Sequence, residues 1–194
     1  MDFSFTESQL AVRDAARKFA QNEVAPGYAE RESNAEIPRA LVAHMGEMGL
    51  IGVDLPESLG GLGADSVTAG VIVEEISRAD INVGYVQLLA SLNGSVLVTH
   101  ALPEVAEVIV PQVCRGEKVV ALGLTEPRGG SDAAHLILRA QPCNEGYRLN
   151  GEKTSISMAA GADPVTLLLV QVPNQKVCCR FDCPEEIFRS IKVR

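Results

Sequence analysis

Tryptophan is absent from this 194-residue sequence, and aromatic residues make up only 4% of it. Hydrophobic residues nevertheless amount to 46% of the chain. A core built from them must therefore consist mainly of alanine, valine, leucine and isoleucine. A chain of this length is sufficient for one large domain or two small ones, so a substantial core is expected.

The five cysteines show no spacing typical of a disulfide framework, and their number is odd. Three of them lie close together near the end of the chain, at Cys178, Cys179 and Cys183. We interpret the cysteines as free thiols in a reducing compartment. A zinc site usually needs four histidine or cysteine ligands at set spacings. Because the three histidines are scattered along the sequence, we predict no metal site.

An excess of basic residues is also missing, since the formal net charge is −8. Such a chain repels phosphate backbones and anionic lipids, which disfavours a role in nucleic-acid or membrane-surface binding. A phosphate-bearing cofactor remains compatible with this charge, because backbone amides and one or two cations can hold it. The acidic, polar start does not resemble a signal peptide, and no stretch offers about 18 uncharged apolar residues. We therefore expect a soluble, cytoplasmic protein.

Residues 1–116 show the pattern of an all-helical bundle, which we predict as the first domain. Thr6 and Gln9 have the spacing of a capping box at a helix start. Gly49 is predicted to end a second helix as a C-cap glycine. Further helices are predicted from about Ser66, from about Asn82 to Thr99, and from near Pro103 to Cys114.

The pattern changes at Glu117, where short apolar runs separated by glycine, asparagine and proline begin. These runs predict a β-domain over residues 117–173. Asn150-Gly151 is a hairpin-turn signal, because both residue types tolerate positive φ. The predicted strands are Val119–Leu124, Leu136–Ala140, Tyr147–Gly151, Thr154–Ser157 and Val165–Val172.

The last segment, residues 174–194, departs from the rest of the chain in composition. It holds five basic residues against three acidic ones, and three of the five cysteines. It shows no clear periodicity. We interpret it as an atypical tail that does not belong to the original fold or is left without partners in it.

One loop combines several features of a ligand-binding turn. It follows a predicted strand, and its glycines allow the backbone to approach a ligand closely. Successive amides in such a turn can form a concave anion site. The residues concerned are Thr125, Pro127, Gly129, Gly130 and Ser131. From these residues alone, a cradle for an anionic cofactor is one interpretation and an ordinary surface turn is the other.

The same loop resembles the signature of the acyl-CoA dehydrogenase family. The signature-like segment is Leu124-Thr-Glu-Pro-x-Gly-Gly-Ser-Asp132. Other segments are similar to further family motifs in the same order: Phe3-x-Phe-Thr-Glu-x-Gln9, Leu55-Pro-Glu-x-x-Gly-Gly-Leu-Gly63, Glu74-Glu-Ile-Ser-Arg-Ala-Asp80, Gly116-Glu-Lys118 and Tyr147-x-Leu-Asn-Gly-x-Lys153. The similarity spans residues 1 to about 170. It implies a multi-domain α and β fold class, an N-terminal all-α helical bundle followed by a truncated antiparallel β-barrel-like middle domain.

The resemblance further implies that FAD lies across the β-domain, between it and a later helical domain. Backbone groups near Leu124 and Thr125 would donate to the pyrimidine edge of the flavin and stabilise its reduced state. Ser131 would lie where the cofactor meets the CoA ester, and so would also bind substrate. The cofactor-binding residues implied are Leu122, Leu124, Thr125, Gly130, Ser131, Ser155, Ile156 and Ser157.

The second flavin-contacting stretch departs from the family pattern. Ser155 stands where the family commonly has a tryptophan that packs against the flavin ring, and it gives up most of that contact area. Ser157 stands where a threonine is common and keeps the hydroxyl. Met158 and Ala159 replace a usual Asn-Gly pair.

The family reaction removes a proton from the carbon next to the thioester and passes a hydride from the next carbon to FAD. The base is a glutamate of the C-terminal helical domain, and this sequence ends before that domain. Glu126 is interpreted as a residue that ties down its turn. We therefore nominate no catalytic residue. The resemblance implies an FAD-dependent acyl-CoA dehydrogenase of fatty acid metabolism, with an acyl-CoA substrate and an electron-transferring flavoprotein as electron acceptor.

Two interpretations of the chain stay open alongside this one. The chain is either a truncated or frameshifted homologue without activity of its own, or a half-subunit that needs a partner supplying the C-terminal helical domain and the base. We expect a homo- or hetero-oligomer. Related flavin oxidases and monooxygenases share the same front end, whereas the net charge disfavours the nucleic-acid-binding offshoot of the superfamily.

Overall fold

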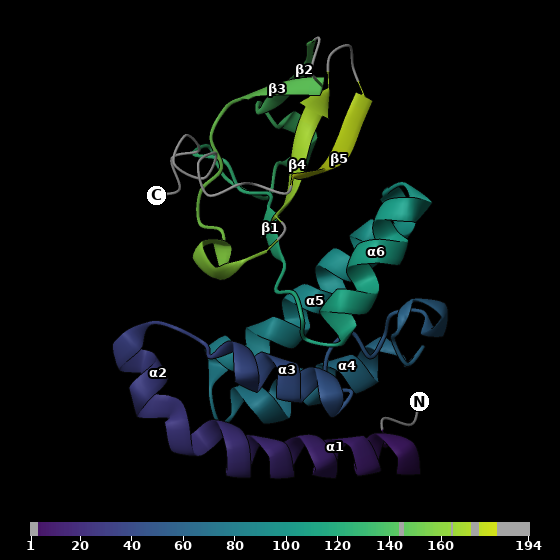
Figure 1. Cartoon of the computed structure of the whole chain (residues 1–194), viewed down its shortest axis with the longest axis vertical. Helices are drawn as coiled ribbons and strands as arrows, with labels where there is room; N and C mark the ends of the chain where they lie inside the picture. Colours follow the sequence, from purple (N-terminus) through teal and green to yellow (C-terminus); the bar gives the residue numbers. More distant parts are fainter. Residues whose placement is uncertain (1–3, 144–145, 164, 172–174, 182–194) are drawn as a thin grey trace. The chain divides into compact units, whose positions relative to one another are not determined.

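The computed structural model of the chain describes residues 4–143, 146–163, 165–171 and 175–181. The chain forms two compact units, Met1–Lys118 and Val119–Arg194. The first is helical and the second contains a sheet (Figure 1). The expected order, a helical domain followed by a β-containing one, is confirmed.

The helical unit contains six α-helices among its described residues. A π-helical turn at Ala20–Val24 and a 3-10 turn at Ala25–Gly27 continue the first helix into the second, and a further 3-10 turn lies at Glu57–Leu59. The helices are α1 Glu7–Phe19, α2 Tyr28–Asn34, α3 Arg39–Glu47, α4 Ser66–Ser77, α5 Ile81–His100 and α6 Pro103–Cys114.

Local sequence signals set two of these helix ends as predicted, whereas α2 was not predicted. The Thr6 hydroxyl accepts a hydrogen bond from the Gln9 N–H, and the Gln9 side chain accepts one from the Thr6 N–H, which completes the capping box. Gly49 follows α3 with φ of +66°, a left-handed conformation that favours glycine. The N–H groups of Gly49 and Leu50 donate to the carbonyls of Gly46 and Met45, which forms a Schellman motif.

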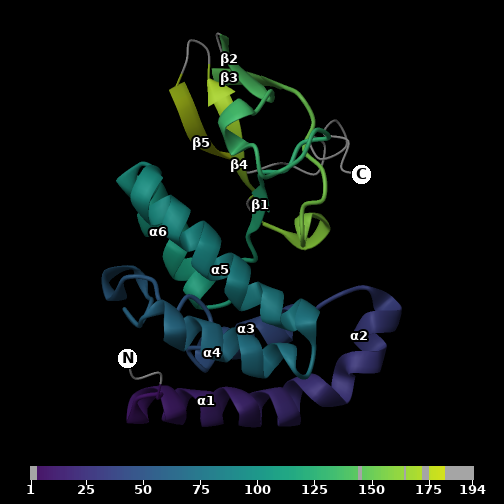
Figure 2. The same cartoon turned by 180° about the vertical axis from the view of Figure 1, so that it is seen from behind.

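Four of the helices pack one against the next. Helix α1 packs against α4, α4 against α5, and α5 against α6. Figures 1 and 2 show α1 from opposite sides, lying along one side of the helical unit. The fully buried side chains include Met45, Leu55, Ile72, Ile76 and Ile109. The core is therefore aliphatic, as the scarcity of aromatic residues requires.

Helix α5 carries no charged residue, and by length and mean hydropathy it is the one described helix that meets the criteria for a membrane span. Half of its most apolar window is buried inside the structure. Gln87 is fully buried in it and accepts a hydrogen bond from the Gly52 N–H at 2.6 Å. Gln87 also donates to Ser91, whose hydroxyl donates to Asp54 at 2.5 Å. These contacts are those of a core helix that anchors the loop after α3.

The sheet of the second unit contains five strands of mixed direction. Strands β1 and β2 both run parallel to β4 on one of its edges, and β5 runs antiparallel to β4 on the other. Strand β3 is antiparallel to β2. The strands are β1 Ala121–Gly123, β2 Arg139–Cys143, β3 Gly146–Asn150, β4 Val165–Gln171 and β5 Gln175–Phe181.

The predicted antiparallel arrangement is confirmed only in part for the described residues, because β2–β3 and β4–β5 are antiparallel whereas β1 and β2 run parallel to β4. Sequence patterns located most of the strands but carry no information about their partners, and β4 takes parallel neighbours that lie far from it in sequence. Figure 1 shows β4 and β5 side by side, and β2 and β3 next to each other. The strands form one mixed sheet.

Two shorter predictions are also wrong. Thr154–Ser157 is not a strand, and Asn150-Gly151 ends β3 without turning into an adjacent strand. Gly151 has φ of +147°, and a Cβ at this position would lie 2.7 Å from the Leu138 Cα. The glycine is therefore needed for a close backbone approach rather than for a hairpin.

The atypical tail is described only over residues 175–181, and the rest of it lies outside the described residues. The backbone of Gln175–Phe181 pairs with β4 from Gln171↔Gln175 to Val165↔Phe181. The expectation of a segment without partners is wrong for these residues. Backbone hydrogen bonding to a strand that ends only a few residues earlier requires no side-chain periodicity, which explains why the sequence did not reveal it.

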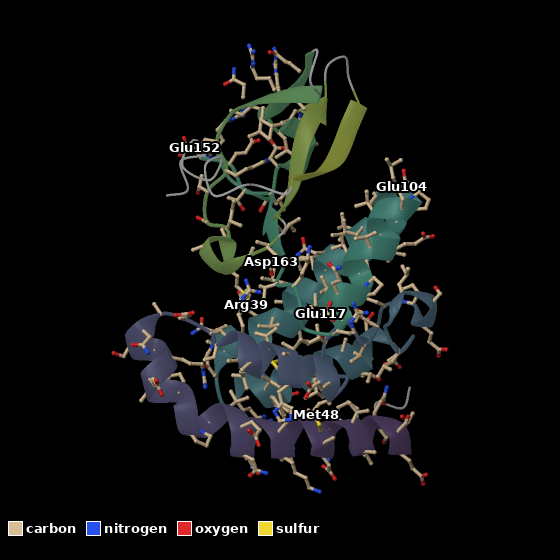
Figure 3. All side chains as sticks on the ribbon, in the orientation of Figure 1. Arg39, Met48, Glu104, Glu117, Glu152 and Asp163 are labelled. Atoms are coloured by element: carbon tan, nitrogen blue, oxygen red, sulfur yellow. The ribbon has the colours of Figure 1, made fainter. Side chains whose placement is uncertain are left out.

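The entry to β1 is fastened by Asp163, which is labelled in Figure 3. Its carboxylate accepts a hydrogen bond from the Val119 N–H at 2.8 Å, and its own N–H donates to the Val119 carbonyl at 2.9 Å. The end of the 3-10 turn Ala159–Gly161 is thereby held to the start of the strand that leads into the signature-like loop.

Candidate functional site

The signature-like loop begins with a tight turn after β1. The Glu126 N–H donates to the Gly129 carbonyl at 3.2 Å, and the Gly129 N–H donates to the Glu126 carbonyl at 2.8 Å. Gly129 has φ of +131°, which side-chain-bearing residues rarely adopt. The turn therefore depends on the glycine, as the sequence predicts.

The Glu126 side chain points into the β-containing unit and is only 3% exposed. Its two carboxylate oxygens accept hydrogen bonds from the N–H groups of Ile137 and Leu138, at 2.8 and 2.9 Å. These donors come just before β2, so one carboxylate joins the loop to the sheet. The interpretation of Glu126 as the residue that ties down the turn is confirmed.

Lys153 completes this buried cluster. Its side chain is fully buried, and its ammonium donates to Glu126 Oε1 and to the Leu124 carbonyl, both at 2.9 Å. The sequence analysis quoted Lys153 within a motif but gave it no role. A lysine at a fixed distance after Asn-Gly was the only signal, because nothing in the local sequence shows that its side chain is buried.

Burial and the charge of the partner shift the pKa of Glu126, and that of Lys153, in opposite directions. Burial by itself raises the pKa of the Glu126 carboxyl, but the N–H groups of Leu138 and Ile137 and the Lys153 ammonium outweigh burial, so this pKa lies below its ordinary value of 4.5. Burial lowers the pKa of Lys153 below its ordinary value of 10.5, and Glu126 offsets only part of that effect.

The loop and the second predicted flavin-contacting stretch are joined through their backbones. The Thr154 N–H donates to the Thr125 carbonyl at 2.9 Å. This bond brings Leu124 and Thr125 together with the stretch that begins at Ser155. Two segments that the sequence predicted separately therefore lie next to each other.

All eight predicted cofactor-binding residues are at least partly exposed. Ser131, Ser155 and Ser157 are exposed, whereas Leu122, Leu124, Thr125, Gly130 and Ile156 are partly exposed. Gly130 lies against the Thr125 hydroxyl, and a Cβ at position 130 would be 2.8 Å from Thr125 Oγ1. Leu122 belongs to β1 itself, where it is paired with Thr166.

The departure at Met158 has a structural consequence. Met158 has φ of +61° and Ser155 has φ of +54°, so both lie in the left-handed region. Asparagine, common in the family at the position of Met158, tolerates this conformation better than methionine does. Methionine therefore stores backbone strain beside the site.

Replacing Met158 with asparagine is expected to raise the free energy of unfolding by about 1 kcal/mol, because it relieves this strain. Met158→Ala is the matched control, since alanine removes the same side chain but keeps a Cβ in the left-handed conformation. Urea unfolding of both variants measures the effect. An asparagine variant no more stable than the alanine variant would contradict the assignment of strain.

Stability is expected to depend on the ionisation of Glu126. Its folded-state pKa is depressed below 4.5, so its contribution is present above that pH and is lost as the pH falls through the folded-state value. The difference in unfolding free energy between the wild type and Glu126→Gln should therefore be constant from about pH 7 to about pH 5 and should narrow as the pH falls further below 4.5. Urea unfolding across this range, with Glu152→Gln as a control for loss of a nearby carboxylate, measures the difference. If the stability difference between the wild type and Glu126→Gln does not change with pH, ionisation of Glu126 does not contribute to stability.

Comparison with known proteins agrees with the motifs. The family model described as the acyl-CoA dehydrogenase N-terminal domain matches residues 6–117. The chain belongs to the acyl-CoA dehydrogenase family.

The chain is similar in sequence or structure to several named proteins. It is 38% identical over 162 residues to a 3-(aryl)acrylate reductase of Clostridium sporogenes, which covers 83% of this chain and 43% of the relative. It is 34% identical over 171 residues to an acyl-CoA dehydrogenase of Bacillus subtilis, which covers 88% of this chain and 45% of the relative. The crystal structure of an acyl-CoA dehydrogenase from Geobacillus kaustophilus superposes with a TM-score of 0.82 at 27% identity, covering 94% of this chain and 50% of that one. The chain thus spans about half the length of these relatives or less.

Proposed function

We propose that this chain forms the helical and flavin-contacting part of an FAD-dependent acyl-CoA dehydrogenase, which oxidises the bond between the α and β carbons of an acyl-CoA thioester. The observation that carries this proposal is the buried Glu126–Lys153 pair, with Nζ and Oε1 2.9 Å apart. The pair fixes the signature-like loop from its inner side. The loop keeps Ser131 exposed and Thr125 and Gly130 partly exposed, which we assign to the ligand side.

The residues of this ligand side fit the pyrimidine edge of a flavin. Hydroxyls of Thr125, Ser131 and Ser157 are at least partly accessible, and Gly130 leaves space that a Cβ would fill. Such donors suit the oxygens and nitrogens of that edge. The FAD, when bound, supplies the acceptor for the hydride. Ser155 offers little contact with the ring, so hydrogen bonds rather than stacking should dominate its binding.

No described carboxylate of the loop is suited to act as the catalytic base. Both oxygens of Glu126 are engaged in the buried cluster. The Asp132 carboxylate pairs with His135 Nδ1 at 2.6 Å on the exposed surface. We therefore propose that the base is contributed from outside the described residues. An electron-transferring flavoprotein as electron acceptor, and assembly with further chains, belong to the same proposal.

A titration of the purified chain with FAD, followed by visible absorbance, tests the proposal. A bound flavin spectrum supports it, and absence of binding at saturating FAD contradicts it. Anaerobic addition of a mixed set of acyl-CoA thioesters then tests the chemistry. Bleaching of the bound flavin would show that a base acts on the substrate, whereas a flavin that binds and never bleaches would restrict the chain to cofactor binding.

Gly130→Ala is expected to weaken FAD binding about tenfold, which corresponds to the loss of one hydrogen bond to the cofactor. The new Cβ would lie 2.8 Å from Thr125 Oγ1 and displace that hydroxyl. Gly161→Ala is the matched control, because a Cβ there meets no atom within 4 Å. If the two variants have equal FAD dissociation constants, the Thr125 hydroxyl does not bind FAD.

A further inference from the structure

We propose that Lys153 is a positioning residue for the flavin, which acts by holding the Leu124 carbonyl and so directing the N–H of Thr125 outward. The inference rests on the function proposed above and goes beyond it, because it assigns a role in cofactor tuning to a side chain that lies inside the β-containing unit. Lys153 does not touch the outer surface, since it is fully buried.

Peptide geometry provides the first step. The Leu124 carbonyl and the Thr125 N–H belong to one planar peptide unit, and in a trans peptide they point in opposite directions. Lys153 Nζ holds the carbonyl oxygen at 2.9 Å from the buried side. The Thr125 N–H therefore points away from Lys153.

The neighbouring peptide unit is fixed in the same manner. The Thr125 carbonyl accepts from the Thr154 N–H at 2.9 Å, and the Glu126 N–H of that unit donates to the Gly129 carbonyl. Two successive peptide planes are thus held by partners on the inner side or within the turn. Rotation of the Thr125 N–H would require breaking at least one of these bonds.

Charge provides the second step. A cation bound to a carbonyl polarises the peptide, which makes the N–H at its other end a stronger donor. Glu126 balances the charge of Lys153, but it does so from the sheet side, where its oxygens bond Ile137 and Leu138. The cation therefore remains the group in contact with the peptide that carries the Thr125 N–H. A stronger donor favours reduced flavin, because reduction adds negative charge to the pyrimidine edge.

The decisive measurement is the reduction potential of bound FAD, together with its dissociation constant. The variant Lys153→Met combined with Glu126→Gln removes the cation without leaving a buried unpaired carboxylate. We expect reduced FAD to lose about tenfold more affinity than oxidised FAD, which lowers the two-electron potential by about 30 mV. Glu152→Gln, one residue away and labelled in Figure 3, is the matched control and should keep the wild-type potential.

A second variant guards against misfolding of the first. Lys153→Gln combined with Glu126→Gln keeps a donor for the Leu124 carbonyl and removes both charges, so its potential should fall between those of the wild type and the first double variant. Thermal unfolding of each protein establishes that it is folded. If both Lys153 variants have the same reduction potential as Glu152→Gln, Lys153 does not tune the flavin, even if FAD affinity falls. Absence of FAD binding by the wild type would instead overturn the proposed function, and this inference with it.

Discussion

Replacing Gly116 with alanine is expected to lower the free energy of unfolding of the helical unit by about 2–5 kcal/mol. Gly116 has φ of +69°, and a Cβ at this position would lie 2.2 Å from the Val42 carbonyl oxygen and 3.0 Å from the Ala43 Cα. All of these neighbours are backbone atoms of α3, so no side-chain rotation relieves the clash. Strain in the left-handed region adds to the cost of moving the helix. Urea unfolding followed by far-UV circular dichroism measures the loss.

Gly70→Ala is the matched control for this prediction. Gly70 lies on the exposed face of α4, and a Cβ there meets no atom within 4 Å. Alanine is favoured over glycine inside a helix by up to about 1 kcal/mol, so this variant should be stabilised. The same chemical change is thus expected to have opposite signs at the two positions. A stabilised Gly116→Ala would show that α3 does not approach position 116 as described.

Replacing Asp80 with alanine is expected to destabilise the helical unit by about 3–5 kcal/mol, because it leaves a buried guanidinium without its counter-charge. Asp80 Oδ2 accepts from Arg31 Nε at 2.8 Å, and the two side chains are only 2% and 8% exposed. Its other oxygen caps α5 by accepting from the Asn82 N–H at 2.9 Å. The substitution therefore removes an ion pair and a helix cap together.

Glu117→Gln is the control for this test, because it removes a carboxylate from an exposed ion pair instead of a buried one. Glu117 and Arg115 are paired at 2.7 Å, but both side chains are more than half exposed. Exposed ion pairs contribute little in water, since solvent screens them. Urea unfolding should therefore show a large loss for Asp80→Ala and a small one for Glu117→Gln. Similar losses for both would mean that the burial of Arg31 has little energetic weight.

Asp80 and Gly116 both connect helices of the helical unit that are distant in sequence. Asp80 joins α5 to α2, and Gly116 joins the end of α6 to α3. Both lie in segments that resemble family motifs. Their physical role is to keep helices of different sequence position at a fixed separation.

Much of the helical unit was predictable from sequence because its signals are local. The capping box at Thr6 and Gln9 and the glycine after α3 act within one helical turn, so neighbouring residues suffice to reveal them. The candidate loop was predictable for a related reason. Its turn depends on Gly129 and on a carboxylate, Glu126, that lies within the turn itself.

The sheet was less predictable, since strand pairing depends on residues far apart in sequence. β4 takes β1 and β2 as parallel neighbours, and no local pattern specifies either partner. Thr154–Ser157 has the composition of a strand but follows a buried lysine and a backbone bond to Thr125, which fix it in another conformation. The hairpin signal at Asn150-Gly151 was misleading because Gly151 serves a close contact with Leu138.

The sequence by itself determined the helical ends, the aliphatic character of the core, the position of the loop and, through its motifs, the family. Only the tertiary structure decided that Glu126 and Lys153 meet as a buried pair, that Lys153 holds the Leu124 carbonyl, and that the stretch from Thr154 lies next to the loop. The physical reason is the range of the interactions. Caps and turns are settled within a few residues, whereas a buried charge pair requires two segments 27 residues apart to exclude water together.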